Sequence, residues 1–376
     1  MKLPPGAWIH AAAARCGSKP ALIGDDRTWT YAALAQEIDR YTHSLAAAAV
    51  GRGQVVAWLG LNSAAQLAML LACARRGALF APLNWRLAPP EHHALLQACK
   101  PALLFADAPF ATALTRGQPA PAGTRCIALG EQGPADFEPF ATFIGAADPT
   151  APASVEVAPD TPLLLCYTSG STGHPKGVVL SHDALCANAD ASVDMHALAE
   201  SDRVLTTLPL FHVGGLNIQT LPALRQGCTV VLHARFDPAA ALAAIAQQRI
   251  TLTVLVPTQL EAVLALPQWP QADLGSLRSI STGSTVVPER LCHAVHARGV
   301  PLIQVWGATE TGPIAACQHA DEARRTAGAA GRAALGVELR IVAADGHDLQ
   351  RGQSGEILVR GRNVMNGYWQ DAAGTA

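Results

Sequence analysis

The stretch Tyr-Thr-Ser-Gly-Ser-Thr-Gly-His-Pro-Lys-Gly, at residues 167–177, gives the strongest indication of the fold. The apolar run 163–166 before it is typical of a buried strand in a parallel sheet. A second apolar run, 178–180, follows the stretch directly, and Ser181 then stands where the N-cap of a helix is expected. A loop between two strand-like segments is a poor candidate for a flexible surface linker.

The same loop has the chemistry of a phosphate site. Its three glycines allow the backbone to approach a ligand closely, and four hydroxyl side chains lie between residues 168 and 172. Successive backbone N–H groups form anion sites, and Lys176 adds a full positive charge. Lys176 is followed by Gly177 rather than by Ser or Thr. The loop is therefore not a Walker A motif, although it suits a phosphate chain.

Length and composition limit the class of protein. A chain of 376 residues is too long for one ordinary core, so two or more packed units are expected. Half of the residues are apolar and 15% are charged, which indicates a globular protein. A formal net charge of −2 gives no electrostatic argument for a nucleic-acid or anionic-membrane partner.

The cysteines and the apolar segments indicate a cytoplasmic protein. There are nine cysteines, with no Cys-x-x-Cys pair, so neither a disulfide framework nor a zinc site is expected. Buried thiols in a reducing compartment are the expectation. The N-terminus has no signal-peptide core, and the longest apolar helix-like run, 64–74, is too short to span a bilayer.

Strand-like and helix-like segments alternate along most of the chain, which predicts an α/β fold with parallel strands. Residues 21–30 read as a hairpin, after which Thr30 is expected to cap a helix that ends near Gly51. Thr258 is a candidate cap for a later helix. Residues 107–160 have weak periodicity and read as irregular connections. From about residue 327 the pattern alternates with period two, which predicts a small antiparallel β subdomain.

Four further stretches have the composition of ligand-binding or structural loops. They are Pro-Leu-Phe-His-Val-Gly-Gly at 209–215, Ser-Thr-Gly-Ser-Thr at 281–285, Val-Trp-Gly-Ala-Thr-Glu-Thr at 305–311, and the segment 355–369, which starts Gly-Glu-Ile and ends Gly-Tyr-Trp. Together with residues 167–177, and in this order, they resemble the signature motifs of the acyl-adenylate-forming superfamily. Its members include acyl-CoA synthetases, luciferases and the adenylation domains of peptide synthetases.

The resemblance implies a role for individual residues. Lys176 and the backbone of residues 168–173 would hold the β- and γ-phosphates of ATP, Thr309 would meet the α-phosphate, Trp306 would stack on adenine, and Glu310 would hold Mg²⁺. The ATP-binding residues implied in this way are Thr168, Ser169, Gly170, Ser171, Thr172, Gly173, Lys176, Ser284, Trp306, Gly307 and Thr309. Lys176, Thr309 and Glu310 would be catalytic, Thr168 would assist at the metal, and His212, Gly214 and Gly283 would line the acyl site.

Some residues depart from the family pattern. Trp306 replaces the usual Tyr, which preserves stacking and loses a phenolic oxygen, and Thr282 and Thr285 depart from a Gly-Gly-Ala-Pro loop. The family continues past the Gly-Tyr-Trp segment to a Thr-Gly-Asp motif and a mobile lid with a catalytic Lys, and no Thr-Gly-Asp occurs here. The chain is therefore expected to be a truncated large N-terminal domain, a fragment or a broken gene product, with poor turnover.

The fold that the resemblance implies is α/β, with two packed parallel-type sheets, flanking helices and a small antiparallel β-barrel-like subdomain at the C-terminal end. The expected division is an adenylation core at 1–326, with two subdomains meeting near 107–160, and the start of the β subdomain at 327–376. The expected ligands are ATP, Mg²⁺, coenzyme A and a small-molecule carboxylic acid. A homodimer is compatible with the sequence.

Three functions remain open at this point. The leading one is an AMP-forming acyl-CoA ligase for a fatty or aryl acid, with a leaning towards fatty acids. The second is an adenylation domain that loads a carrier protein; residues 214–220 contain no acidic side chain to pair with a substrate amine, which argues against an amino acid. The third is an inactive nucleotide-binding remnant, against which the intact loop and Glu310 argue.

Overall fold

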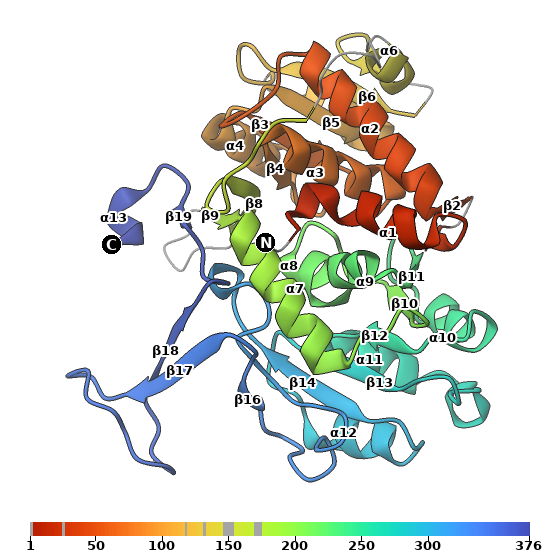
Figure 1. Cartoon of the computed structure of the whole chain (residues 1–376), viewed down its shortest axis with the longest axis vertical. Helices are drawn as coiled ribbons and strands as arrows, with labels where there is room; N and C mark the ends of the chain where they lie inside the picture. Colours follow the sequence, from red (N-terminus) through yellow and green to blue (C-terminus); the bar gives the residue numbers. More distant parts are fainter. Residues whose placement is uncertain (1–2, 25–26, 117–118, 131–132, 146–153, 169–174) are drawn as a thin grey trace.

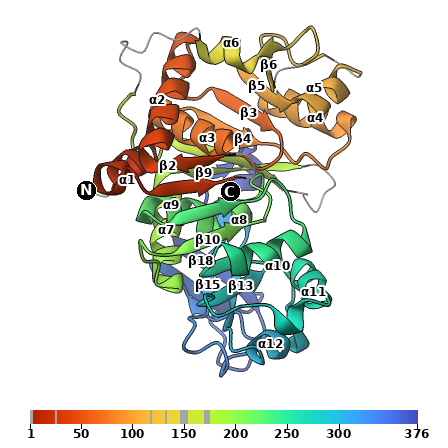
Figure 2. The same cartoon turned by 90° about the vertical axis from the view of Figure 1, so that its right-hand side faces the viewer.

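The computed structural model describes residues 3–24, 27–116, 119–130, 133–145, 154–168 and 175–376. In this part of the chain two large sheets form the body of the molecule, one in the upper and one in the lower half of Figures 1 and 2. A third, two-stranded sheet lies apart from them. The predicted α/β class with two parallel-dominated sheets and a small antiparallel sheet is confirmed.

The first sheet has eight strands among the described residues. In order across the sheet they are β19 (Gly367–Tyr368), β9 (Lys176–Ser181), β8 (Pro162–Thr168), β4 (Leu79–Pro82), β3 (Val55–Leu59), β5 (Leu103–Asp107), β6 (Arg125–Leu129) and β7 (Glu138–Pro139). The strands from β8 to β7 are parallel, whereas β9 runs antiparallel to β8 and to β19. The stretch 167–177 therefore joins the two arms of a hairpin.

The second sheet has nine strands within the described residues. In order they are β16 (Arg332–Ala333), β15 (Ala316–Cys317), β14 (Leu302–Trp306), β13 (Ser279–Gly283), β12 (Leu252–Val254), β10 (Arg203–Thr206), β11 (Thr229–Leu232), β1 (Pro20–Ile23) and β2 (Thr28–Thr30). The strands from β14 to β1 are parallel and the outer ones antiparallel. Because β13 and β14 are parallel neighbours, their carboxyl ends meet at one edge of the sheet.

Helices separate the two sheets and cover their outer faces (Figure 1). Those of the first half are α1 (Trp8–Cys16), α2 (Tyr31–Ala47), α3 (Ala64–Arg76), α4 (Pro89–Cys99), α5 (Ala108–Thr115) and α6 (Phe140–Gly145). Those of the second half are α7 (His182–His196), α9 (Leu221–Gln226), α10 (Pro238–Gln247), α11 (Pro257–Leu264) and α12 (Glu289–His296). One buried core joins both halves: it contains Trp58 and Phe80 of the first sheet, Val204 and Val230 of the second, and Leu70 of α3.

The two ends of the chain cross between the sheets. The N-terminal hairpin of β1 and β2 pairs with β11 at the edge of the second sheet, although the segments that follow it build the first sheet. Near the C-terminus, β19 returns from the second half and pairs with β9 of the first sheet, in the register Gly367 with Val179 and Tyr368 with Val178. Each sheet is therefore completed by a strand from the far end of the chain.

The segment after β16 forms the small antiparallel sheet. It consists of β17 (Val337–Val342) and β18 (Glu356–Gly361), and in Figure 1 it projects from the rest of the molecule. Its side chains Ile341, Ile357 and Leu358 are 40 to 45% exposed. A short helix, α13 (Ala372–Thr375), ends the chain.

Caps that the sequence predicted are partly confirmed. Thr30 and Ser181 accept hydrogen bonds from the third backbone N–H of α2 and α7. Gly51 is not the cap of α2, because that helix ends at Ala47 and Ala49 takes the left-handed turn, at φ 55°. Thr258 is inside α11, which begins at Pro257 and has Val256 as its N-cap.

The expectation of irregular connections at 107–160 is wrong for much of that segment. It contains α5, β6, β7 and α6, and β6 continues the parallel sheet beside β5. The strand is short and alternates poorly, because Arg125 is exposed and Cys126 is half-buried, while Ile127 and Ala128 are both buried. The sequence of this strand therefore lacks the alternating pattern from which a strand is predicted.

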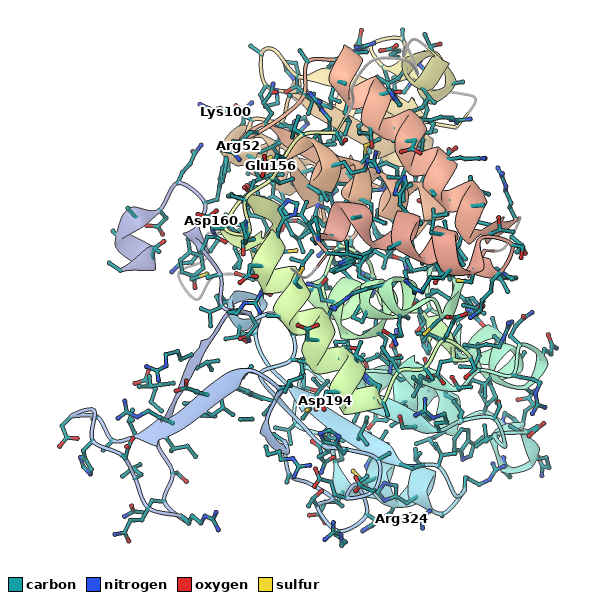
Figure 3. All side chains as sticks on the ribbon, in the orientation of Figure 1. Arg52, Lys100, Glu156, Asp160, Asp194 and Arg324 are labelled. Atoms are coloured by element: carbon teal, nitrogen blue, oxygen red, sulfur yellow. The ribbon has the colours of Figure 1, made fainter. Side chains whose placement is uncertain are left out.

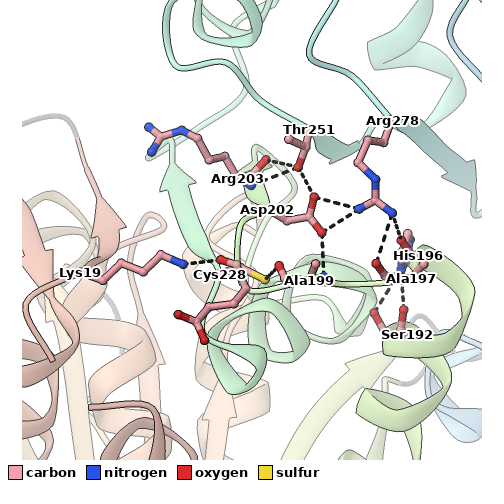
Figure 4. Close-up of polar contacts among 11 residues, drawn as sticks. Lys19, Ser192, His196, Ala197, Ala199, Asp202, Arg203, Cys228, Thr251 and Arg278 are labelled. Carbon is pink, nitrogen blue, oxygen red and sulfur yellow. Dashed lines mark hydrogen bonds and ion pairs between the residues drawn. The ribbon is translucent and has the colours of Figure 1, made fainter. Parts of the chain in front are cut away.

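An ion pair with a buried carboxylate and a partly exposed guanidinium ties α7 to the second sheet (Figure 4). The carboxylate of Asp202, 3% exposed, accepts two hydrogen bonds from one guanidinium nitrogen of Arg278, at 2.7 and 2.8 Å. It also accepts from the Thr251 hydroxyl at 2.7 Å and from the backbone N–H of Ala199 at 2.9 Å. Arg278 in turn donates to the carbonyls of residues 196 and 197 at the end of α7.

The polar surface and the thiols are as expected for a globular protein. Charged side chains such as Arg52, Lys100 and Glu156 are exposed on the outside (Figure 3). All nine cysteines are free thiols, seven of them buried. None of the described helices has both the length and the apolar character that crossing a membrane requires.

Candidate active site

A cavity of about 650 Å³ opens at the carboxyl edge of the second sheet. Six of the predicted site residues line it: His212, Gly214, Gly283, Ser284, Gly307 and Thr309. They come from three loops that are distant in sequence. The carboxyl ends of parallel strands share one edge, and in open α/β sheets ligands bind at that edge. The cavity is therefore the leading candidate for the binding site.

The first loop brings an aromatic cluster to the cavity. Phe211 is buried, with its ring centroid 4.4 Å from that of His212 and 6.3 Å from that of Trp85. His212 precedes the short helix α8 (Val213–Gly215). The His212 side chain is exposed, yet partial desolvation by the surrounding protein, and then the positive charge of Arg86, lower the pKa of His212 below its ordinary value. A neutral imidazole therefore borders the cavity at neutral pH.

Gly215 keeps this loop close to its own start. A Cβ on Gly215 would overlap the carbonyl oxygen of Pro209, whereas one on Gly214 would meet the Cδ1 of Ile218 at an ordinary 3.7 Å. Both glycines line the cavity. The π-helical segment η2 (Leu216–Thr220) follows them. Such wide turns frequently occur at functional sites, because they redirect side chains.

The second loop follows β13. Gly283 pairs with Val305 of β14, and a Cβ at this position would overlap the carbonyl oxygen of Val305. Ser284, next to it, has φ 75°, a left-handed conformation that is uncommon outside glycine. Backbone held in such a conformation is often found at ligand sites.

The third loop follows β14. Gly307 approaches Pro313 closely, since a Cβ would lie 2.7 Å from its backbone. The loop then forms the short helix η4 (Thr309–Thr311), where the Thr311 hydroxyl accepts from the N–H of Ala308 at 2.9 Å. This turn directs Thr309 to the cavity wall.

Glu310 lies beside the C-terminal segment. Its Oε1 accepts a hydrogen bond from the Tyr368 hydroxyl at 2.9 Å, and its carbonyl accepts from the N–H of Met365 at 2.8 Å. The Nζ of Lys176 lies 4.9 Å from the centre of the Tyr368 ring. Partial desolvation, and then the contact with Glu310, raise the pKa of Tyr368. Tyr368 thus connects the predicted phosphate-binding lysine with the predicted metal-binding carboxylate.

Other predicted residues are not among those that line the cavity. Trp306 is half-buried at the end of β14, between Val305 and Gly307, which do line it. The Thr168 hydroxyl donates to the Lys176 carbonyl across the hairpin, at 3.4 Å. Ser169, Gly170, Ser171, Thr172 and Gly173 lie outside the described residues, so their predicted contacts with phosphate stay predictions.

Several residues at this site were not predicted from the sequence. Trp85 and Arg86 line the cavity, and the Arg86 guanidinium lies 5.0 Å from the Trp85 ring. They lie in the loop after β4, which ends at Pro82, and this position after a parallel strand is the signal that points to them. Tyr368 belongs to the segment 355–369, for which the sequence predicted no ligand contact.

The acidic groups suit a magnesium ion that arrives with a nucleotide. Within the described residues there is no cluster of three or more His, Cys, Asp or Glu side chains that would form a complete metal cage. Mg²⁺ is commonly held by one or two carboxylates together with substrate phosphates. Glu310, with an oxygen positioned by Tyr368, fits this mode.

Comparisons with known proteins agree with the arrangement. The model of the AMP-binding enzyme family matches residues 9–369. Indoleacetate–CoA ligase of Aromatoleum aromaticum is 53% identical over 371 residues, which are 98% of this chain and 72% of that protein. Feruloyl-CoA synthase of an Amycolatopsis species is 38% identical over 377 residues, 99% of this chain and 72% of the relative.

Solved structures of the same kind superpose on the chain. The N-terminal domain of FACL13 from Mycobacterium tuberculosis has a TM-score of 0.89 at 27% identity, covering 98% of this chain and 91% of that one. The anthranilate CoA ligase AuaEII, solved with anthranoyl-AMP, has a TM-score of 0.92 at 25% identity, covering 99% of this chain and 72% of that one.

Proposed function

The chain belongs to the AMP-binding enzyme family, and we propose that it activates an aryl carboxylic acid with ATP for transfer to coenzyme A. One observation carries the proposal: three loops with the family's motifs converge on a single cavity of about 650 Å³. The relatives with 53% and 38% identity are named for indoleacetate and ferulate, which are both aryl acids. Relatives named for fatty acids are 30 to 34% identical, which favours the aryl reading over the fatty-acid one.

The proposed reaction has two steps. A carboxylate oxygen of the acid attacks the α-phosphorus of ATP, the bond from that phosphorus to the bridging oxygen breaks, and pyrophosphate leaves. The thiolate of coenzyme A then attacks the acyl carbon, and AMP leaves with the former carboxylate oxygen. Neither step needs a nucleophile from the protein, so catalysis rests on positioning and on neutralising charge.

We assign roles to this chain's residues on that basis. Lys176 would neutralise charge on the departing phosphates, and Thr309 would donate to the α-phosphate. Trp306 would stack on adenine, and Glu310 would hold a Mg²⁺ ion that supplies further charge neutralisation. His212 and Gly283 would border the acyl group. A neutral imidazole at His212 suits contact with an apolar ring better than a charged one does.

Binding of Mg·ATP tests the proposal. Calorimetry on this chain should give saturable binding, and Glu310→Gln should weaken it about tenfold or more, because a neutral amide is a poor ligand for Mg²⁺. Lys176→Ala should weaken it as well. The matched control is Glu156→Gln, since Glu156 is exposed on the outer surface (Figure 3) and should bind as the parent does.

The class of acid can be tested with stable analogues of the acyl-adenylate intermediate. A stable sulfamoyl analogue of indole-3-acetyl-AMP should bind this chain more tightly than a decanoyl analogue of the same kind. Tighter binding of the decanoyl analogue would contradict the aryl assignment. Failure of both analogues and of Mg·ATP to bind the folded chain would contradict the whole proposal and support the inactive-remnant reading.

A further inference from the structure

A second, much smaller void lies behind the wall of the main cavity. Its volume is about 10 Å³, room for one water molecule. The void and the main cavity share four lining residues: Leu208, Gly214, Gly215 and Val254. Because Gly214 and Gly215 have no side chains, the wall between the two spaces is thin.

The void is polar. Thr206, Thr207, Gln219 and Thr220 contribute to its lining. The Thr206 and Thr220 hydroxyls are 2.8 Å apart, and Thr220 also donates to the carbonyl of Gly215 at 2.6 Å. By contrast, the Thr207 hydroxyl and the Gln219 Oε1 have no hydrogen-bond partner in the described structure. Thr207 is 1% exposed and Gln219 is 2% exposed.

Leaving a buried polar atom unpaired costs more than an average hydrogen bond gains, so each such atom calls for an explanation. Two of them beside one void indicate that a hydrogen-bonding group belongs there. Gln219 lies in η2, the π-helical segment that follows the cavity loop. Its side chain thus comes from a turn of the kind that redirects residues toward functional sites.

A chain of hydrogen bonds fixes which end of the Gln219 amide faces the void. His196 is buried, and burial lowers its pKa to about 4, so the ring is neutral. Its Nδ1 lies 2.9 Å from the carbonyl of Ser192, which can only accept, so Nδ1 carries the proton (Figure 4). Nε2 must then accept, and it lies 2.9 Å from the Ser281 hydroxyl.

The remaining link follows from this assignment. Since Ser281 gives its proton to His196, its oxygen accepts from the Gln219 Nε2, at 3.3 Å. The amide nitrogen of Gln219 is therefore held toward Ser281, and its carbonyl oxygen remains free at the void. A free carbonyl oxygen accepts hydrogen bonds and cannot donate them.

We propose that Gln219 and Thr207 form a polar subsite behind the acyl cavity, which takes a hydrogen-bond donor on the far end of the substrate, such as a ring N–H or a hydroxyl. The donor reaches Gln219 Oε1 directly or through one water in the void. This inference rests on the proposed function and narrows it: the acid is an aryl acid with a donor on its ring.

Two acids of nearly equal shape test the subsite. Indole-3-acetic acid has a ring N–H, and benzofuran-3-acetic acid has a ring oxygen at the same position. Sulfamoyl-adenosine analogues of both acyl-adenylates are titrated calorimetrically into the 376-residue chain. We expect the indole analogue to bind about tenfold more tightly, the effect of roughly one hydrogen bond.

Variants test whether Gln219 and Thr207 cause the preference for the indole analogue. Gln219→Leu should reduce the ratio of the two dissociation constants to below about twofold and leave Mg·ATP affinity unchanged. Thr207→Val, which keeps the side-chain shape, should reduce the ratio in part. This variant tests the subsite if Gln219→Leu fails to fold. Ser281→Ala releases the amide of Gln219, which can then also offer its NH₂ group, so the ratio should fall. A merely structural role of Ser281 would lower both affinities equally.

The possible outcomes distinguish failure of this inference from failure of the proposed function. If both analogues bind tightly and equally, or if the preference survives both Gln219→Leu and Thr207→Val, the polar subsite is refuted and the proposed function stands. If neither analogue binds, this inference is refuted, and if Mg·ATP also fails to bind, the proposed function fails with it.

Discussion

Gly214 and Gly215 are adjacent, both line the cavity and both have helical neighbours, yet the structure predicts opposite results for adding one methyl group. At Gly214 the new Cβ would have its nearest contact at 3.7 Å, an ordinary van der Waals distance. At Gly215 it would overlap the carbonyl oxygen of Pro209, which is backbone and has little freedom to move. The φ of Gly215 is −68°, so backbone strain does not explain the difference.

The magnitudes follow from these contacts. Gly214→Ala should raise the free energy of unfolding by about 0.4–1 kcal/mol, because it restricts the unfolded chain. Gly215→Ala should lower it by about 1–3 kcal/mol or more, the usual cost of overpacking. Unfolding entropy is about 2.1 cal/mol/K per residue, which over 376 residues makes 1 kcal/mol worth about 1 °C in Tm.

Thermal unfolding and analogue binding together test the predictions for Gly214→Ala and Gly215→Ala. Gly214→Ala should melt at or slightly above the parent Tm, and Gly215→Ala about 1–4 °C below it. Because the methyl of Gly214→Ala thickens the wall behind the cavity, it should also weaken the indole-3-acetyl analogue about tenfold or more with Mg·ATP affinity kept. Equal Tm values for the two variants would refute the close approach of Gly215 to Pro209.

Three further results are expected. Asp202→Asn should lower the free energy of unfolding by about 1–2 kcal/mol, because the amide NH₂ of the variant replaces a buried carboxylate oxygen that accepts hydrogen bonds; urea unfolding that matches the parent would contradict this. Tyr368→Phe should weaken Mg·ATP binding about tenfold by releasing Glu310, which titration of the variant would measure. The folded-state pKa of His196 is depressed to about 4, so the unfolded chain binds more protons in acid and stability falls as the pH falls through 6.5 towards 4. Urea unfolding at pH 6.5 and 5.0 should differ by about 1.5 kcal/mol from this group, and His196→Gln should remove that share.

Much of the site was predictable because strand topology decides where loops meet. Gly283 ends β13 and Gly307 follows β14; these strands are parallel neighbours in the α/β alternation that the sequence predicted, and such strands end at one edge. The motif residues His212 and Thr309 then had to approach the same cavity. Local patterns sufficed here because each loop is attached directly to a strand.

The residues that escaped prediction depend on packing between distant segments. Tyr368 reaches Glu310 across 58 positions, which no local pattern reveals. Gln219 belongs to a segment whose sequence looks like an ordinary helix, and only the wide π turn and the contact with Ser281 give its amide an orientation. Trp85 and Arg86 enter the cavity because Phe211 packs against them.

The crossing of the chain ends has a consequence for how the protein is made. Strand β9 carries Lys176, and its outer edge is covered by residues 367–368, which are synthesised almost two hundred positions later. Until they emerge, that edge offers unpaired backbone groups to any neighbouring strand, a recognised route to aggregation. The nascent chain therefore has to protect β9 until residues 367–368 are made, and the strand that finally covers it also brings Tyr368 to Glu310.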